Sequence, residues 1–311
     1  MIIGDDRERV IENIRFATEC GVYHAKVETA DPVLTPEQRK AVLERFAQKN
    51  GTPLFRAKTQ VARHIANGAT RKFNKRTRIV GVEHIEAISG GAILTSNHFS
   101  PIDNTILRTF ARRMGKKRLC VVSQETNLMM KGMFGFLMNY ADILPISLDH
   151  HYLCNHFEPM LKDALAAGDF VLIYPEEEMW FHYRKPRPPK PGAYYYAAKL
   201  GVPIVSCFTE IRDLPEPDEK GFRQVEYTLH ILEPIFPDPE KSLRENKLAM
   251  SSRDYLQKKA AYEAIYQKEL DYTFRPDDIA GWIHGENGPV SLCEPPPLSR
   301  QQNYLHNPND R

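Results

Sequence analysis

Short apolar runs that alternate with helical stretches, beginning at Arg78, constrain the fold of this chain more than any other feature. The runs have the β-branched and aromatic character of buried strands, and helical stretches separate most of them. The expected strands are Ala92–Ser96, Leu119–Ser123, Ile143–Ile146, Phe170–Tyr174, Pro203–Phe208 and Val225–Ile231. The expected helices between them are Pro101–Met114, about Leu153–Ala167 and Tyr194–Leu200. This order predicts an α/β fold in which helices flank a largely parallel sheet.

Two further regions flank this core. Between Pro36 and about Phe73, apolar residues recur at helical spacing among basic ones, with a break at Gly51-Thr52-Pro53. After Pro239 we expect one long polar helix to about Phe274, and then an irregular tail that contains Pro295-Pro296-Pro297. The chain is therefore divided into three expected segments. These are a basic helical N-terminal segment (1–77), an α/β core (78–235) and a C-terminal helix with its tail (236–311).

Positive charge is concentrated in the N-terminal segment, although the formal net charge of the 311-residue chain is only +2. Residues 36–80 contain twelve Lys or Arg and two acidic residues, a local balance of +10. Such a balance is typical of a segment that lies near phosphates, either of lipid headgroups or of nucleic acid. A solvated helical face is the other interpretation of this pattern.

Several features indicate a soluble, cytosol-facing protein. The polar start MIIGDDRERV is not typical of a secretory signal. The most apolar window, Leu128–Leu144, is interrupted by Lys131, Asn139 and Asp142, so no run of about 18 apolar residues occurs. The five cysteines are scattered without CxxC spacing, which indicates free thiols in a reducing compartment.

The segment Asn97–Asp103 is the strongest candidate for chemistry. Ser100 suits a helix N-cap, and its spacing to Asp103 is that of a capping box, in which case His98 is an incidental turn residue. However, α/β folds place ligands where a strand ends and a helix begins. A histidine followed five residues later by an aspartate can supply a general base and the carboxylate that orients it. The spacing alone is compatible with both interpretations.

Four sequence blocks in order resemble the glycerolipid acyltransferases, the family of lysophosphatidate and glycerol-3-phosphate acyltransferases. Asn97–Asp103 fits the NHxSxxD block, and Phe134–Ile146 resembles the second block. Tyr174–Glu176 resembles the start of the third block, whose family form is FPEGTRS. Lys190–Ala193 followed by Val202–Val205 resembles the closing stretch. The resemblance covers roughly residues 78–210, and no GxSxG element suggests a hydrolase instead.

The resemblance implies roles for individual residues. His98 is the expected general base, Asp103 its partner, and Glu176 an acceptor-site residue. The residues expected to support the oxyanion or the shape of the site are Asn97, Ser100 and Pro203. The expected reaction moves a fatty acyl group from acyl-CoA or acyl carrier protein to a hydroxyl of a glycerolipid-type acceptor. By family, that acceptor is 1-acylglycerol-3-phosphate and the pathway is phospholipid biosynthesis.

The resemblance also implies the partners of the protein. The expected partners are an acyl thioester donor, a lipid acceptor and a membrane surface, contacted through the basic N-terminal segment. No metal or other cofactor is expected, and nucleic acid is not an expected partner. The expected location is the cytoplasm, on the inner face of the cytoplasmic membrane. A non-catalytic lipid-binding protein on the same fold is the alternative hypothesis.

The sequence departs from the family pattern where the acceptor phosphate is held. The second block has Asp142 in place of a glycine and Leu148 in place of an arginine. The third block continues Glu177-Glu178-Met179, where the family has Gly-Thr-Arg, and adjacent carboxylates repel a phosphate. The cations that are expected to replace the missing arginines are Arg184, Lys185, Arg187 and Lys190. The alternative is an acceptor that carries no phosphomonoester.

Two other segments have ordinary explanations. Asp149–Glu158 contains His and Cys residues, but their spacing matches no zinc pattern, so we expect a polar helix start. The Met-rich run Met129–Met138 is expected to be core, with an acyl-chain channel or a membrane-dipping edge as the sharper alternative.

Overall fold

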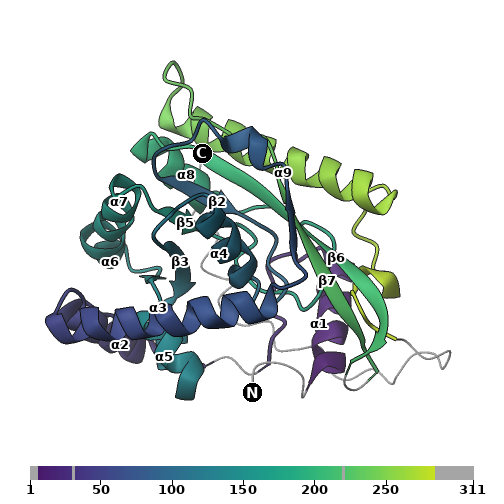
Figure 1. The fold of residues 1–311 in the computed structure, drawn as a ribbon, viewed down its shortest axis with the longest axis horizontal. Coiled ribbons are helices and arrows are strands. Elements are labelled where there is room, and N and C mark those ends of the chain that lie inside the picture. The colour runs from purple at the N-terminus through teal and green to yellow at the C-terminus, as the bar shows by residue number, and fades with distance from the viewer. Residues whose placement is uncertain (1–5, 30–31, 219–220, 284–311) are drawn as a thin grey trace.

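A seven-stranded sheet forms the centre of the computed structural model, which describes residues 6–29, 32–218 and 221–283 (Figure 1). The strand order is β1-β7-β6-β2-β5-β3-β4, and only the β6–β7 pair is antiparallel. The strands are β1 (Arg78–Val80), β2 (Ala92–Thr95), β3 (Leu119–Gln124), β4 (Ile143–Ile146), β5 (Phe170–Leu172), β6 (Ile204–Pro217) and β7 (Arg223–Ile231). All six expected strands are present, and β1 is additional. The largely parallel α/β sheet is therefore confirmed.

Helices cover the sheet and extend along one edge of it. The α-helices are α1 (Arg7–Glu19), α2 (Pro36–Lys49), α3 (Pro53–Phe73), α4 (Asn104–Arg113), α5 (Gly132–Tyr140), α6 (His150–Tyr152), α7 (Glu158–Ala166), α8 (Gly192–Leu200) and α9 (Leu243–Tyr266). Shorter turns are η1 (Val82–Ile85), η2 (Glu125–Met129), the π-type η3 (Leu153–Phe157) and η4 (Pro276–Asp278). The expected break at residues 51–53 separates α2 from α3, where Thr52 caps the new helix. The sequence did not predict α1 or α5.

Side chains of each central strand alternate between two buried layers. On β2, Ala92 and Leu94 pack against α4, whereas Ile93 packs on the opposite face, in the layer that contains α7 and α8. β5 alternates in the same way, with Phe170 and Leu172 on the α4 face. Because both faces are covered, these strands are apolar throughout, as buried parallel strands are. This burial explains why continuous apolar runs, rather than alternating ones, marked the strands.

Helix α1 belongs to a separate apolar cluster beside the sheet. Its residues Val10, Ile11 and Ile14 pack with Trp180 and Phe181, which follow β5 in the chain. The N-terminal helix therefore supports the segment that follows the third sequence block. This contact could not be predicted from local patterns, because the partners are about 170 residues apart in the chain.

The remaining expectations about the chain have mixed outcomes. The expected polar helix after Pro239 is α9, which begins with a capping box between Ser242 and Glu245. The expected tail with Pro295–Pro297 lies outside the described residues, as does Cys293. The other four cysteines are free thiols. Within the described ranges, no helix is both long and apolar enough to cross a membrane. The division into three segments stays a prediction.

Candidate active site

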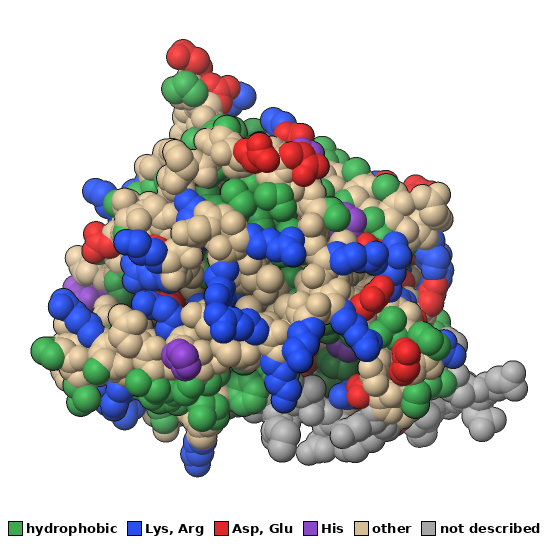
Figure 2. Space-filling model, in the orientation of Figure 1, with side chains coloured by type: hydrophobic (Ala, Val, Ile, Leu, Met, Phe, Trp, Pro, Cys, Tyr) green, Lys and Arg blue, Asp and Glu red, His purple; other side chains and the backbone are tan. Residues whose placement is uncertain are grey.

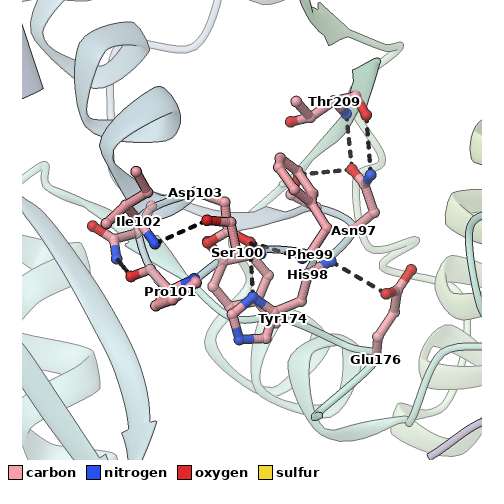
Figure 3. A network of polar contacts seen from close by, with 12 residues as sticks. Asn97, His98, Phe99, Ser100, Pro101, Ile102, Asp103, Tyr174, Glu176 and Thr209 are labelled. Carbon is pink, nitrogen blue, oxygen red and sulfur yellow. Dashed lines mark hydrogen bonds and ion pairs between the residues drawn. The ribbon is translucent and has the colours of Figure 1, made fainter. Parts of the chain in front are cut away.

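His98 and Asp103 form a hydrogen-bonded pair in the turn between β2 and α4 (Figure 3). His98 Nδ1 lies 2.8 Å from Asp103 Oδ2. The Asp103 side chain is 0 % exposed, and that of His98 is 19 % exposed. An ionised carboxylate can only accept hydrogen bonds, so Nδ1 carries the proton of a neutral imidazole and Nε2 is left as the basic atom. The exposed part of His98 gives a reactant access to this ring.

The Asp103 carboxylate accepts four hydrogen bonds. Besides His98, Oδ2 accepts the backbone N–H groups of Phe99 at 2.9 Å and Ser100 at 3.1 Å. Oδ1 accepts the phenol of Tyr174 at 2.5 Å. The Ser100 hydroxyl accepts the N–H of Ile102. The expected helix start at Pro101, with Ser100 as its N-cap, is wrong, because α4 begins at Asn104 and Asp103 is its N-cap residue. One carboxylate therefore closes the turn and orients His98.

The residue before His98 fastens the turn to the sheet. The Asn97 amide donates to the carbonyl of Thr209 at 3.0 Å and accepts its N–H at 2.8 Å (Figure 3). Thr209 lies on β6, the neighbour of β2, and both residues are buried. Asn97 thus continues the sheet pairing beyond the end of β2 and supports the position of His98.

Glu176 lies on the other side of the turn. Its Oε2 accepts the backbone N–H of His98 at 3.2 Å (Figure 3). The same carboxylate accepts the backbone N–H of Arg187 at 2.9 Å and its Nε at 3.1 Å. The Arg187 side chain is 0 % exposed, contacts the carbonyls of Tyr23 and Glu178, and lies over the Trp180 ring. Glu176 and Arg187 are therefore a buried ion pair that supports the turn carrying His98.

The segment after the third block runs along the turn. The N–H of Trp180 donates to His98 O at 3.0 Å, and that of His182 donates to Phe99 O at 2.9 Å. Burial lowers the pKa of His182 to about 4, so this ring is neutral at pH 7. The backbone on both sides of His98 is thus held by protein partners.

These contacts bear on the expected oxyanion donors. The N–H groups of His98, Phe99, Ser100 and Ile102 donate to side chains, and that of Asp103 donates to Ser100 O. Each of these donors already has an acceptor inside the protein. These backbone N–H groups are therefore used within the protein, and the expected role of Asn97 and Ser100 in supporting the oxyanion stays a prediction.

The four expected acceptor-binding cations are placed in different environments. Lys185 is fully buried, and its Nζ lies 2.7 Å from Asp278 Oδ2. Arg184 pairs with Asp213 at 2.5 Å and also donates to the carbonyl of Ile211. Arg187 is held by Glu176, as described above. Lys190 differs from these three because its side chain is partly exposed. Three of the four cations therefore have internal partners.

Pro203 is not brought to the pair. Its carbonyl accepts the N–H of Ile93, and the register aligns Ile93 with Ile204 in parallel strands. Pro203 therefore lies at the amino end of β6, whereas His98 follows the carboxyl end of β2. From the sequence, Pro203 is expected to support the shape of the site, but this residue lies at the opposite edge of the sheet from His98.

The described residues show no cluster of three or more His, Cys, Asp or Glu side chains that could hold a metal ion. In the Asp149–Glu158 segment, His150 and Cys154 approach only to 3.8 Å. Asp149 instead caps the start of α6, as expected for a polar helix start.

The core of the chain is similar to a known protein family. Residues 76–210 match the model of the acyltransferase family. This match spans the region of the four sequence blocks, so the chain is similar to the acyltransferases where the resemblance predicted it.

One solved structure resembles the chain across most of its length. It is the 1-acyl-sn-glycerophosphate (LPA) acyltransferase PlsC from Thermotoga maritima. The two sequences are 17 % identical, the match covers 85 % of this chain and 98 % of that one, and the TM-score is 0.45. No curated protein matches the sequence.

Two departures from the family blocks coincide with left-handed backbone. Asp142 has φ +61° and Glu177 has φ +62°, and the family sequence has glycine at both positions. Glycine adopts this conformation without strain, whereas other residues usually do not. Asp142 has a compensating contact, because Arg63 of α3 binds its carboxylate through two nitrogens at 2.7 and 2.9 Å. The Asp142 side chain thus ties the basic helix α3 to the core.

Proposed function

We propose that this protein transfers a fatty acyl group from acyl-CoA or acyl carrier protein to a hydroxyl of a glycerolipid-type acceptor. The observation that carries the proposal is the His98–Asp103 pair, a buried carboxylate that holds a partly exposed imidazole, within an acyltransferase core. The tautomer set by Asp103 leaves Nε2 free to take a proton, which is what attack by an alcohol on a thioester requires.

The proposed reaction needs no covalent enzyme intermediate. The acceptor oxygen attacks the thioester carbonyl carbon while its proton passes to His98 Nε2. Asp103 stabilises the resulting imidazolium, and the C–S bond then breaks. The leaving thiolate takes the proton back from His98, so the products are an ester and a free thiol. General base catalysis of this kind contributes typically about 10²–10⁴-fold.

The first experiment tests the two residues in the pair. We expect His98→Ala and Asp103→Ala to lower acyl transfer by at least about 10²-fold while thermal unfolding remains cooperative. His151→Ala is the matched control, because His151 is exposed on α6. Full activity of a folded His98→Ala protein would contradict the proposal. Lipid binding without thioester turnover in the unmodified protein would favour the non-catalytic alternative.

The internal partners of Arg184, Lys185 and Arg187 favour an acceptor without a phosphomonoester. A cation that is already paired and buried has few donors left for a phosphate, and breaking the pair exposes a buried charge. Thioester turnover should be measured with 1-acylglycerol-3-phosphate, glycerol-3-phosphate, a monoacylglycerol and a glycolipid as acceptors. Similar kcat/KM values for 1-acylglycerol-3-phosphate and the monoacylglycerol would support an acceptor without a phosphomonoester. A strong preference for 1-acylglycerol-3-phosphate would contradict it.

Membrane contact through α3 and α5 is part of the proposal. Leu54 and Val61 on α3 are 66 % and 55 % exposed, and Met133 on the neighbouring α5 is also exposed. Figure 2 shows hydrophobic side chains along the lower edge of this face, below a band of Lys and Arg side chains. An apolar strip bordered by cations fits a surface of anionic lipid.

Vesicle flotation tests this contact. We expect binding to vesicles with anionic lipid, weakened by high salt and by a Leu54→Glu/Val61→Glu pair of substitutions. Leu256→Glu is the control, because Leu256 is similarly exposed on α9. Equal binding to neutral and anionic vesicles, unaffected by the α3 substitutions, would contradict the proposed contact. Binding to DNA in preference to vesicles would favour the nucleic-acid interpretation of the basic segment.

A cavity beside this surface suits part of an acyl chain. It measures about 210 Å³ and lies between α2, α3, α5 and η2, with Phe46, Phe55 and Leu128 among its lining residues. η2 follows the carboxyl end of β3, the same sheet edge from which His98 projects. We expect Leu128→Trp, which fills this space, to lower activity with long-chain donors more than with short-chain ones. An unchanged chain-length profile would contradict this assignment.

A further inference from the structure

Tyr174 contacts both members of the His98–Asp103 pair, although the sequence blocks assign it no role. Its hydroxyl donates to Asp103 Oδ1 at 2.5 Å, on the oxygen that His98 does not use. Its ring stacks on the His98 ring with centroids 3.9 Å apart and planes inclined by 12°. In Figure 3 the Tyr174 ring lies directly against the imidazole. One side chain therefore touches the acid and the base at the same time.

The two contacts have different physical consequences. The stacked ring restricts rotation of the imidazole about its Cβ–Cγ bond, so Nε2 keeps one direction relative to the turn. The hydroxyl satisfies the Asp103 oxygen that would otherwise be an unpaired acceptor in a side chain shielded from water. A hydrogen bond to an ionised carboxylate stabilises its charged form. Burial and the Asp103 charge raise the pKa of the Tyr174 phenol well above 10, so it remains a donor at neutral pH.

We propose that Tyr174 is a positioning residue that fixes the plane of His98 and holds Asp103 in its ionised form. This inference rests on the proposed acyltransferase role of the pair. The family form of the third block has phenylalanine at this position, which can supply the stacked ring but not the hydroxyl. In this chain the hydroxyl completes the set of four donors around Asp103.

The titratable groups that face the pair from neighbouring elements are Tyr227 on β7, Cys207 on β6 and Glu176. Burial raises the pKa of the Tyr227 phenol and of the Cys207 thiol above their ordinary values, so both are neutral near pH 7. Glu176 is paired with Arg187 and contacts only the backbone of His98. Tyr174, by contrast, hydrogen-bonds the Asp103 carboxylate and stacks on the His98 ring, so its removal should act on the pair directly.

Tyr174→Phe separates the hydroxyl from the ring. Without the hydroxyl, the negative charge of Asp103 is less well stabilised. The pair therefore binds a proton more strongly, either on the carboxylate or on His98. Both effects favour forms in which Nε2 is not a free base, and the acidic limb of the kcat/KM profile should move to higher pH by about 0.5–1 unit. We expect kcat/KM at neutral pH to fall by roughly 5- to 20-fold. Tyr174→Leu removes the stack as well and should lower kcat further.

The control is Tyr183→Phe. It removes a buried phenol that has no hydrogen-bond partner among the described residues and lies in the α1 cluster. This substitution should leave the pH profile unchanged. Because phenylalanine keeps the ring, Tyr174→Phe should fold even if Tyr174→Leu does not.

NMR titration of the His98 imidazole, without substrate, makes the test independent of the reaction. In the unmodified protein we expect the proton on Nδ1, and in Tyr174→Phe a titration midpoint at higher pH. A Tyr174→Phe protein whose titration and pH profile both superimpose on those of the unmodified protein would overturn the inference. If the NMR midpoint moves but no acceptor is acylated by the unmodified protein, the inference stands and the proposed function fails.

Discussion

Replacing Arg187 by methionine tests whether this cation holds the fold or binds the acceptor. Arg187 and Glu176 form a pair in which neither side chain is appreciably exposed. At an effective dielectric constant of about 20, unit charges about 4 Å apart attract each other by about 4 kcal/mol. Removing one partner of such a pair leaves a buried, uncompensated charge and typically destabilises a protein by about 3–5 kcal/mol.

The loss of stability expected for Arg187→Met is large relative to the stability of an ordinary domain, which is about 5–15 kcal/mol. It should appear as a fall in the thermal midpoint of roughly 5–8 °C, measured by circular dichroism or calorimetry. The matched control is Arg275→Met, because Arg275 pairs with Asp271 at 2.8 Å on the surface. Exposed pairs contribute about 0–1 kcal/mol, so this control should unfold near the unmodified midpoint.

A second substitution makes the result specific to the pair. In the double variant Arg187→Met/Glu176→Gln, the buried charge is gone, so part of the lost stability should return. In a folded Arg187→Met protein, kcat should fall more than the acceptor affinity changes, because Glu176 also holds the backbone of His98. Unchanged stability together with a raised KM for a phosphorylated acceptor would refute this reasoning and return Arg187 to the acceptor site.

Three further substitutions have defined outcomes in denaturation experiments. Asp142→Ala should destabilise the protein by several kcal/mol, because the left-handed backbone strain remains and Arg63 loses its partner. Arg63→Lys retains a cation at this position and should lose less stability. Equal losses of stability in the two variants would contradict this account. Lys258 and Asp254 form a buried ion pair on α9, and both side chains hydrogen-bond Thr95 on β2. Lys258→Met should lower the thermal midpoint by leaving the buried Asp254 charge without its cation, and an unchanged midpoint would contradict the role of this pair in joining α9 to the sheet. Because the pKa of His182 is lowered to about 4, the unfolded chain binds more protons between about pH 4 and 6.5, so stability should fall as the pH is lowered through that window. His182→Asn should flatten this dependence, and an identical slope would contradict it.

The fold class could be predicted because burial on both faces of the sheet produces apolar patterns within short stretches of sequence. A strand covered on two sides must be apolar at every position, and a helix on a sheet must be apolar at helical spacing. These patterns marked the six strands from Ala92 onward and the break between α2 and α3. Helix α1 escaped notice because its apolar stripe is short and its partners, Trp180 and Phe181, lie far along the chain.

His98 and Asp103 were found for a related reason, since the pair lies within one turn and its spacing is a local property. The sequence marks Tyr174 only as the first residue of the third block and indicates no role for it. It reaches Asp103 across 71 positions because β2 and β5 are neighbours in the sheet. The only sequence signal was a hydroxyl-bearing aromatic residue at a position where the family has phenylalanine.

The sequence by itself determined the layered α/β core, the acyltransferase blocks and the catalytic candidate, because each is encoded by patterns a few residues long. Only the tertiary structure decided what the charges near the site do. The sequence has four cations after the third block, but a cation can bind a ligand readily only if it is not already paired with a carboxylate of the protein. Asp278 lies 93 positions from Lys185, and Asp213 lies 29 positions from Arg184. Such pairings depend on which elements meet in space, so three of the four expected acceptor ligands are instead paired with carboxylates of the protein.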